Sequence, residues 1–325
     1  MSGAVEIRRI TAADQQAKYD QIAASRGTIF NQLIWLRMFT DNITTYGIYD
    51  REDLVGGFCL YSDKKFGVTI VRNPPFTQTI GPFLDVAAQN PVSVMNSWKK
   101  ILSVMSEYIA NSNHCLVSFT LNKCVVDTQP FLWRKFRVSP VYTYVIDLNV
   151  PLTAIRATMS GERRNDISKA LRDGLVVEQV RDYHTVKELV LKTFARQGKK
   201  LGEKYLNKIL FDFSLAGNAY AFVTYDNGSP VAASFCVYDR ETAYYVLGGY
   251  DDERRHHGAG PLACWAAIEK AQELGLKYFD FEGSMVRDIE RYFRGFGGRL
   301  TPFYRVTKAW LPVELVLKFF RRGLF

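Results

Sequence analysis

A chain of 325 residues, 47% of them hydrophobic and 23% charged, has the composition of a globular protein, which excludes a disordered or fibrous chain. No apolar run approaches the ~18 residues of a membrane-spanning helix, and the first ten residues lack the apolar core of a secretory signal. The net charge of +9 favours an anionic partner, such as a nucleotide cofactor, a phosphorylated substrate, tRNA or an acidic membrane surface, although many basic proteins are simply soluble.

The cysteines indicate the compartment. They are five in number, scattered along the chain, and without a CxxC pair. This pattern is typical of buried thiols in a reducing environment and does not suit a disulfide framework or a zinc site. We therefore expect a cytoplasmic protein without a bound metal.

The length suits two domains of roughly 150 residues each, and a repeated segment supports that division. The stretch from Ile48 to Tyr61 reads Tyr-Asp, a polar turn, Val, two small residues, Phe-Cys, an aliphatic residue and Tyr. The stretch from Thr224 to Tyr238 repeats this order with a single inserted residue. Alternating residues around a turn rich in Asp, Asn and Gly predict a β-hairpin in both places.

A second match follows each hairpin in the same order. Residues 133–136 (WRKF) and 140–142 (PVY) resemble residues 293–296 (FRGF) and 302–304 (PFY). Between the hairpin and this second match, each half carries a helix-like stretch followed by a strand-like stretch. These lie at about 91–112 and 114–121 in the first half, and at about 260–274 and 276–282 in the second half. These ordered matches indicate an internal duplication, and we expect residues 28–148 and 174–308 to superpose as two copies of one α/β fold.

The two halves join near residue 150. The strand-like run Val141–Val150 ends at Pro151, and proline disfavours helix in the residue before it. A basic helix, Leu152–Asp173, follows and stops at Gly174. A strand, helical segments across 183–217, the second hairpin, a further strand, a helix, a strand and a final β run complete the pattern. We therefore expect an α/β fold with a mixed sheet, in domains 1–150 and 151–308, with a C-terminal amphipathic helix over 309–325.

One motif in the second half indicates chemistry. Arg255-His256-His257-Gly258-Ala259-Gly260 connects a strand that ends in Gly248-Gly249-Tyr250 to an apolar helix. Glycines let the backbone approach a ligand closely, and the first free N–H groups of a helix favour a diphosphate. Arg255 can add a charge-assisted contact. The alternative is a tight strand-to-helix turn in which glycine only supplies unusual dihedral angles.

Two expectations follow for the residues of this motif. His256 and His257 lack a nearby acidic or thiolate ligand set, so we expect them to contact phosphate or solvent and not a metal. A side chain at Gly258 or Gly260 would obstruct a diphosphate. Gly258→Val should therefore weaken its binding and leave the fold mostly intact.

The motif resembles the acyl-CoA pyrophosphate loop of the GNAT N-acyltransferase superfamily. The duplicated architecture, the basic helix SGERRNDISKALRDG and the ending FDFEGS…IERYFRGFGG resemble a narrower group, the Fem-type transferases and related GNAT-like proteins linked to cell-wall or surface-polysaccharide synthesis. The resemblance covers residues 151–308 well and residues 28–148 loosely. It implies that the second domain binds acyl-CoA through residues 255–260. The first domain, whose corresponding segment FLDVAAQNPVSVMNS lacks glycine, would shape the acceptor pocket.

The resemblance also implies direct attack of an amine on the thioester, with the carbonyl oxygen held by backbone N–H near Gly248 and Gly249. Two glycines can equally mark a β-bulge. The amine must lose a proton, and the departing thiolate benefits from gaining one. Asp280 and Glu282 lie two residues apart on a predicted strand and therefore on the same face, so that either can serve as the base. The alternative is that each is a solvated or paired carboxylate at a strand end. Tyr292 resembles the tyrosine that protonates the thiolate in many GNAT enzymes, at a spacing one residue shorter, and is otherwise a core aromatic.

These features predict an N-acyltransferase that moves an acyl group, acetyl above all, from acyl-CoA to a small-molecule or lipid-linked amine of a sugar, nucleotide-sugar or cell-envelope precursor. One alternative is tRNA-dependent, Fem-type aminoacyl transfer to a peptidoglycan precursor. Against it, Phe293-Arg294 stands where the Fem enzymes usually have a Lys-rich FK-type motif. Another alternative is a non-catalytic binding protein with the same fold.

The tail from Trp310 to Phe325 predicts a basic amphipathic helix. Its polar stripe consists of Glu314, Lys318, Arg321 and Arg322. Its apolar stripe consists of Trp310, Val313, Leu317, Phe320 and Leu324. Such a helix can rest on the inner membrane surface or pack on the protein's own core.

Overall fold

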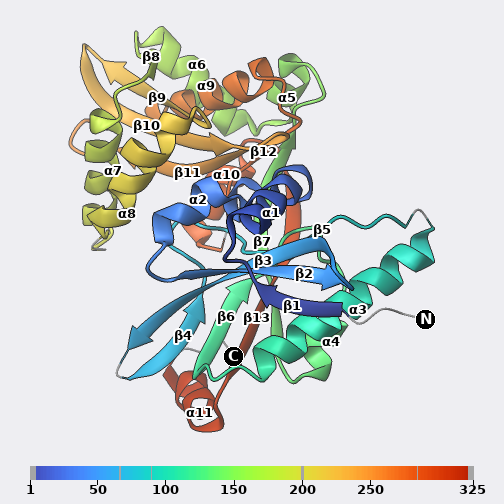
Figure 1. Ribbon diagram of the computed structural model, residues 1–325. Coiled ribbons are helices and arrows are strands. Elements are labelled where there is room, and N and C mark those ends of the chain that lie inside the picture. Colours follow the sequence, from blue (N-terminus) through green and yellow to red (C-terminus); the bar gives the residue numbers. More distant parts are fainter. Residues whose placement is uncertain (1–4, 66, 89, 199–200, 284, 321–325) are drawn as a thin grey trace. The chain divides into compact units, whose positions relative to one another are not determined.

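The computed structural model describes residues 5–65, 67–88, 90–198, 201–283 and 285–320. The chain divides into two compact units (Figure 1). The first consists of Met1–Val141 and Pro302–Phe325, and the second of Tyr142–Thr301. Each unit is a mixed β-sheet with helices packed on it, which confirms the α/β prediction.

Among the described residues, the first unit forms its sheet from six strands of its own, of which the short β5 pairs only with β3, and from one strand near the end of the chain. Its elements are, in order, β1 (Val5–Arg9), α1 (Ala13–Arg26), η1 (Ile29–Asn31), α2 (Leu33–Leu36), η2 (Arg37–Phe39), β2 (Ile43–Asp50), β3 (Asp53–Lys65), β4 (Val68–Arg72), β5 (Phe83–Leu84), α3 (Pro91–Ala110), β6 (Leu116–Thr120), α4 (Gln129–Trp133) and α11 (Leu311–Phe320). The order in space is β1-β2-β3-β4-β6-β13, with β4 and β6 parallel and the other neighbours antiparallel.

The second unit repeats this succession of strands and helices after two additional helices. Its elements are α5 (Leu152–Thr158), α6 (Gly161–Arg172), β8 (Val176–Val180), α7 (His184–Arg196), α8 (Glu203–Asn207), η3 (Lys208–Asp212), η4 (Phe213–Ala216), β9 (Ala219–Asp226), β10 (Ser229–Tyr238), β11 (Thr242–Tyr250), α9 (Ala259–Glu273), β12 (Tyr278–Asp280) and α10 (Arg287–Arg294). Both predicted hairpins are confirmed as antiparallel pairs, β2 with β3 and β9 with β10.

Two strands pass from one unit to the other. β7 (Arg137–Asp147) starts in the first unit, and its last residues, Val145–Asp147, pair with β12 of the second. β13 (Arg299–Ala309) starts in the second unit, and Arg305–Ala309 pair with β6 of the first. Each unit is therefore completed by the last strand of the other half of the chain. The compact units differ for this reason from the contiguous domains 1–150 and 151–308 expected from the sequence.

The basic segment before β8 is two helices and not one. Met159 is extended, with ψ 152°, and separates α5 from α6. The side chain of Ser160 then accepts a hydrogen bond from the Arg163 N–H, at 3.2 Å, and so caps α6 at its N-terminus. α6 stops before Gly174, whose φ of +86° suits glycine.

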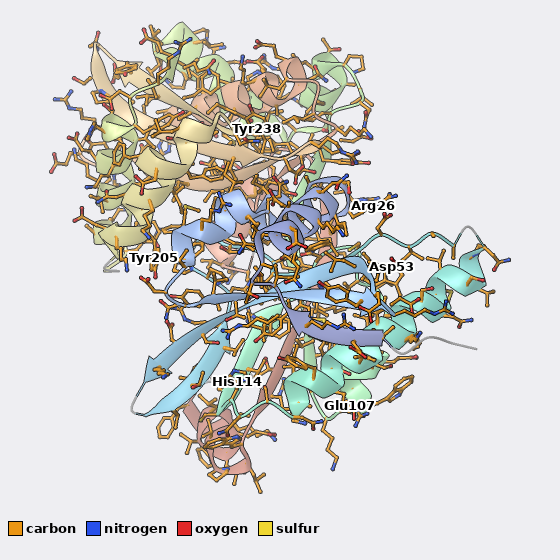
Figure 2. The ribbon with its side chains drawn as sticks, in the orientation of Figure 1. Arg26, Asp53, Glu107, His114, Tyr205 and Tyr238 are labelled. Atoms are coloured by element: carbon orange, nitrogen blue, oxygen red, sulfur yellow. The ribbon has the colours of Figure 1, made fainter. Side chains whose placement is uncertain are left out.

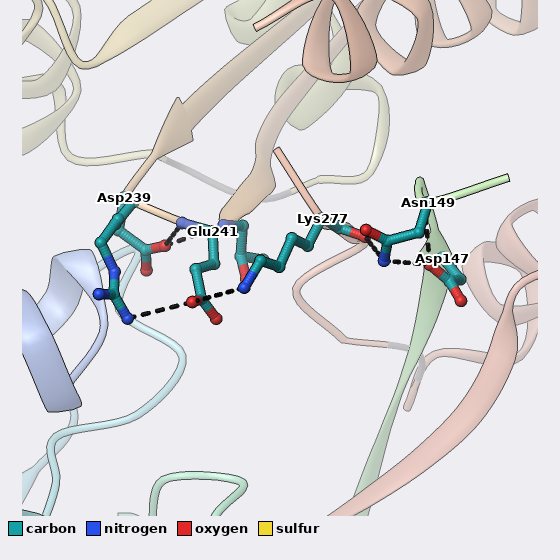
Figure 3. A network of polar contacts seen from close by, with 7 residues as sticks. Asp147, Asn149, Asp239, Glu241 and Lys277 are labelled. Carbon is teal, nitrogen blue, oxygen red and sulfur yellow. Dashed lines mark hydrogen bonds and ion pairs between the residues drawn. The ribbon is translucent and has the colours of Figure 1, made fainter. Parts of the chain in front are cut away.

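The start of the parallel pair β11–β12 is held by polar contacts (Figure 3). Lys277 Nζ lies 3.0 Å from the Glu241 carboxylate, and the Lys277 N–H donates to the Glu241 carbonyl at 2.8 Å. The Lys277 carbonyl accepts from the Leu148 N–H, at 2.8 Å, directly after β7. β7, β11 and β12 are thus tied together at one end, which is opposite the end that carries the motif.

No helix of the described residues is long and apolar enough to cross a bilayer. The described residues also contain no group of three or more His, Cys, Asp or Glu side chains that could hold a metal ion.

Candidate active site

The sheet of the second unit opens between two parallel strands. β11 pairs with β12 from Thr242 to Tyr244, opposite Tyr278 to Asp280, and that pairing ends there. β11 continues to Tyr250 paired with β10, and the register between these two strands passes over Val246, which forms a bulge. The two strands therefore part beyond Tyr244.

Both glycines of β11 have a packing reason inside the protein. A Cβ atom at Gly248 would stand 2.5 Å from the hydroxyl of Tyr245. One at Gly249 would stand 2.7 Å from the Cβ of Leu189, so this glycine lets α7 approach the strand. A role for their backbone N–H groups in holding a carbonyl oxygen stays a prediction, while these contacts explain the absence of side chains.

Gly258 lies against a neighbouring helix and not at an open surface. A Cβ atom there would stand 2.1 Å from the Asp166 carbonyl oxygen and 2.8 Å from the Cβ of Ala170, both on α6. Its φ of −86° is ordinary for any residue. The expectation that Gly258→Val would leave the fold mostly intact is therefore wrong, because valine would displace α6.

Gly260 is different, because its empty side is open. A Cβ atom there would meet one neighbour, the hydroxyl of Tyr292, at an ordinary 3.5 Å. Tyr292 comes from α10, so the fold brings this candidate acid to the first turn of α9. Of the two glycines expected to admit a ligand, Gly260 is the one whose geometry permits it.

His256 is held by contacts within the unit. Its Nδ1 accepts a hydrogen bond from the Gly258 N–H at 3.1 Å, and its Nε2 lies 2.9 Å from a carboxylate oxygen of Asp173. Since Nδ1 accepts a hydrogen bond, Nε2 carries the ring proton and donates a hydrogen bond to the Asp173 carboxylate. Contacts with His256 and Lys169 hold the pKa of Asp173 below its usual value. The sequence interpretation missed Asp173, which ends α6.

These contacts reduce the number of N–H groups available to a diphosphate. His256 takes two of them, since its carbonyl accepts from the Ala259 N–H at 3.0 Å. Pro261 has no N–H. The Gly260 N–H remains as a donor in the first turn of α9, at the positive end of the helix.

The cationic residues of the motif lie at the surface. The Arg255 side chain is 70% exposed, and its Nε donates to the Asp252 carbonyl at 3.1 Å. His257 and Arg254 are also exposed. Binding of a diphosphate at this turn stays a prediction, and it would depend more on side-chain charge and less on backbone N–H groups than the motif suggested.

The two candidate carboxylates are not placed alike. β12 ends at Asp280, which is fully buried and accepts hydrogen bonds from the Thr143 hydroxyl, at 2.6 Å, and from the Glu282 N–H, at 2.8 Å. Glu282 is half-buried and has a φ of +67°, so strand alternation does not put the two on one face. Asp280 therefore holds the turn after β12, while a role for Glu282 as the base stays a prediction.

Tyr292 packs in an aromatic cluster beyond the end of β12. Its ring centroid lies 5.7 Å from that of Phe293 and 5.4 Å from that of Phe296. Burial, and after it the Cys264 thiol, raises the pKa of Tyr292 well above its usual value. The phenol therefore keeps its proton at neutral pH, as a donor to a thiolate must.

Arg163 is a second residue that the sequence interpretation did not select. It is 8% exposed, its Nη1 lies 3.0 Å from Asp166, and its Cζ lies 4.6 Å from the centroid of the Tyr292 ring. Its buried Nε has no hydrogen-bond partner among the described residues. The basic helix was a visible signal, but nothing in the sequence distinguishes the buried Arg163 from its exposed neighbours.

The comparisons with known proteins agree with this geometry. Residues 161–294 match the acetyltransferase (GNAT) domain family, and these residues contain the opened sheet, the motif and Tyr292. Residues 161–294, within the second unit, therefore contain a GNAT acetyltransferase domain. No curated protein matches the sequence.

Solved structures extend the likeness of fold to nearly the whole chain. FemX has a TM-score of 0.68 at 12% identity, over 96% of this chain and 99% of that chain. L-PGS from Bacillus licheniformis has a TM-score of 0.54 at 14% identity, over 94% and 95%. A tandem GNAT protein from the clavulanic acid biosynthesis pathway has a TM-score of 0.52 at 12% identity, over 94% and 98%. The chain as a whole is thus similar in fold to these tandem GNAT-like structures.

Proposed function

We propose that the protein is an N-acyltransferase that moves an acyl group, acetyl above all, from acyl-CoA to an amine of a sugar, nucleotide-sugar or other cell-envelope precursor. The observation that carries the proposal is the position of the Tyr292 hydroxyl, which faces the open side of Gly260 at the start of α9. This juxtaposition puts a proton donor beside the helix start that would receive the donor substrate, within the residues that match the GNAT family.

We assign a separate role in the proposed reaction to each group of residues. Bound acyl-CoA supplies an acyl group activated as a thioester. Arg255, His257 and the Gly260 N–H would bind its diphosphate. Glu282 would take the proton that the amine must lose, as the amine nitrogen bonds to the acyl carbon. Tyr292 would give its proton to the sulfur as the carbon–sulfur bond breaks, and would regain one from solvent.

The first unit is proposed to bind the acceptor, because its own chain replaces the donor loop. Between β4 and α3 the segment runs beside β3 as β5, which pairs with β3 in antiparallel fashion at Gly56 and Gly57. A Cβ atom at Gly56 would stand 2.2 Å from the Phe83 carbonyl oxygen, so glycine is needed for this close pairing. Four of the five cysteines are buried and all are free, which supports a reaction in the cytoplasm.

A second candidate is aminoacyl transfer from tRNA to a peptidoglycan precursor. The likeness of fold to FemX over nearly the whole chain favours it. The reduced set of backbone donors at α9 is also compatible with a donor other than CoA.

Calorimetric titration distinguishes the two candidates. We expect acetyl-CoA and free CoA to bind the wild-type protein with dissociation constants below the millimolar range. Gly260→Val should weaken both at least about tenfold, because its side chain would occupy the open space before Tyr292. Leu215→Ser, at an 85% exposed site, is the matched control and should change neither. Binding of aminoacyl-tRNA without binding of CoA would replace the first proposal by the second.

A further inference from the structure

α11 exposes an apolar surface that its own unit does not cover. None of its residues is buried, and Leu311, Phe319 and Phe320 are 71%, 82% and 82% exposed. Leu315 and Val316 are each 56% exposed. A helix packed on the protein's own core would bury one face, and these exposures show that α11 does not.

The sequence predicted this helix correctly, but it did not predict which of its residues are exposed. Val313 and Leu317, two members of the predicted apolar stripe, are half-buried, as is Glu314, which pairs with Lys318 at 2.6 Å. The exposed face is instead the set Leu311, Leu315, Val316, Phe319 and Phe320, called here the α11 face. Arg321, Arg322 and Leu324 lie outside the described residues.

Positive charge surrounds the start of this helix. Lys308, at the end of β13, donates from Nζ to the Arg134 carbonyl at 2.6 Å. Its pKa is lowered, first by partial burial and then by the charges of Lys135 and Arg134, which shows that three cations lie close together. The Arg134 side chain also pairs, at 2.9 Å, with Glu107 of α3, labelled in Figure 2.

The surrounding sequence has the same sign. From residue 301 to residue 325 there are five basic residues and one acidic residue. An exposed apolar helix beside clustered cations has the chemistry of a helix that lies in the interface of an anionic bilayer. A purely apolar protein partner would not account for the charge.

We propose that α11 binds an anionic lipid membrane. The α11 face enters the boundary between headgroups and acyl chains, while the exposed Lys135 faces the lipid phosphates. Aromatic side chains such as Phe319 and Phe320 supply most of the buried apolar area. The proposal concerns the first unit and does not depend on the acyl-transfer reaction.

Flotation of the full-length protein with lipid vesicles tests this surface. The vesicles contain equal parts of phosphatidylglycerol and phosphatidylcholine, or phosphatidylcholine alone. We expect the wild type to float with the anionic vesicles and, in rising salt, to be released from them. The double variant Phe319→Ser/Phe320→Ser should lose about tenfold or more of this binding, and Lys135→Gln should lose a smaller part and show a weaker salt dependence.

A matched pair of substitutions controls for general surface hydrophobicity. Val92 and Met95 of α3 are 64% and 66% exposed, and Val92→Ser/Met95→Ser should float like the wild type. Unchanged thermal unfolding of each variant shows that its fold is kept. Absence of wild-type flotation, or equal flotation of Phe319→Ser/Phe320→Ser, would overturn the proposal. A dimer that this variant converts to a monomer, without lipid binding, would assign the α11 face to self-association instead.

Discussion

At the scale of single residues, the site depends on the environment of one phenol. Tyr292 is half-buried beside the rings of Phe293 and Phe296, and the Arg163 guanidinium lies over its ring at 4.6 Å. Burial raises the pKa of Tyr292, while the positive charge of Arg163 opposes part of that rise. We therefore expect Arg163 to be a positioning residue, which holds the phenol through this contact and opposes part of the rise in its pKa.

Replacement of Tyr292 by Phe tests the proposed proton donor. We expect CoA to bind as before and turnover to fall by roughly 10²–10⁴, the usual contribution of a general acid. Single-turnover kinetics beside calorimetric binding measure the two effects separately.

A second buried tyrosine provides the control. The Tyr220 hydroxyl donates to the Ala267 carbonyl at 2.9 Å, within the helix packing. Tyr220→Phe should cost about 1 kcal/mol of stability and leave turnover unchanged. Equal turnover of Tyr292→Phe and the wild type would remove Tyr292 from the mechanism.

At the scale of elements, the packing of α6 on the start of α9 decides what the glycine motif can do. The Gly258 backbone lies against the Asp166 carbonyl, and His256 bridges the Gly258 N–H to Asp173 at the end of α6. These contacts fix the strand-to-helix turn before any ligand binds. Gly258 is therefore needed for the packing of α6, whereas Gly260 leaves open space at the start of α9.

This division predicts opposite effects of alanine at the two glycines. Gly258→Ala should destabilise the protein by about 1–3 kcal/mol, because the new methyl group would meet backbone at 2.1 Å. Gly260→Ala should be neutral or should stabilise by up to about 1 kcal/mol, since Ala is the better residue inside a helix and has room there. Urea denaturation of both variants gives the two values, and a larger loss for Gly260→Ala would contradict the assignment.

At the scale of the whole molecule, the exchange of β7 and β13 makes each unit depend on both halves of the chain. β7 contributes Tyr144 and Ile146 to the hydrophobic core of the second unit, and Leu148 follows them. β13 continues the sheet of the first unit at β6. A cut at the join near residue 150 therefore removes core residues and not merely a linker.

Two fragments of the second unit test this dependence. A fragment of residues 142–301 keeps β7 residues for pairing with β12, whereas a fragment of residues 151–301 lacks three core side chains. Each large apolar side chain lost from a core costs roughly 2–5 kcal/mol, so we expect the shorter fragment to be unfolded or aggregated and the longer one to be folded. Circular dichroism and thermal melting compare them, and equal stability would contradict the role given to β7.

The sequence by itself determined the elements and their repetition. The two hairpins, the strand-to-helix turn at residues 250–260 and the C-terminal helix follow from local patterns of polar, apolar and glycine residues, which depend on neighbours along the chain. The match to a GNAT family over residues 161–294 rests on the same local patterns.

The tertiary structure alone decided which of these residues serve the site. The steric limit at Gly258 and the hydrogen bond of His256 to Asp173 depend on α6, which lies dozens of residues earlier in the chain. The burial of Arg163, on α6 itself, depends in turn on the distant segment that carries Tyr292. The exchange of β7 and β13 depends on pairing between strands more than 130 residues apart. Contacts at such separations leave no periodic signal along the chain, because their geometry exists only once the sheet has formed.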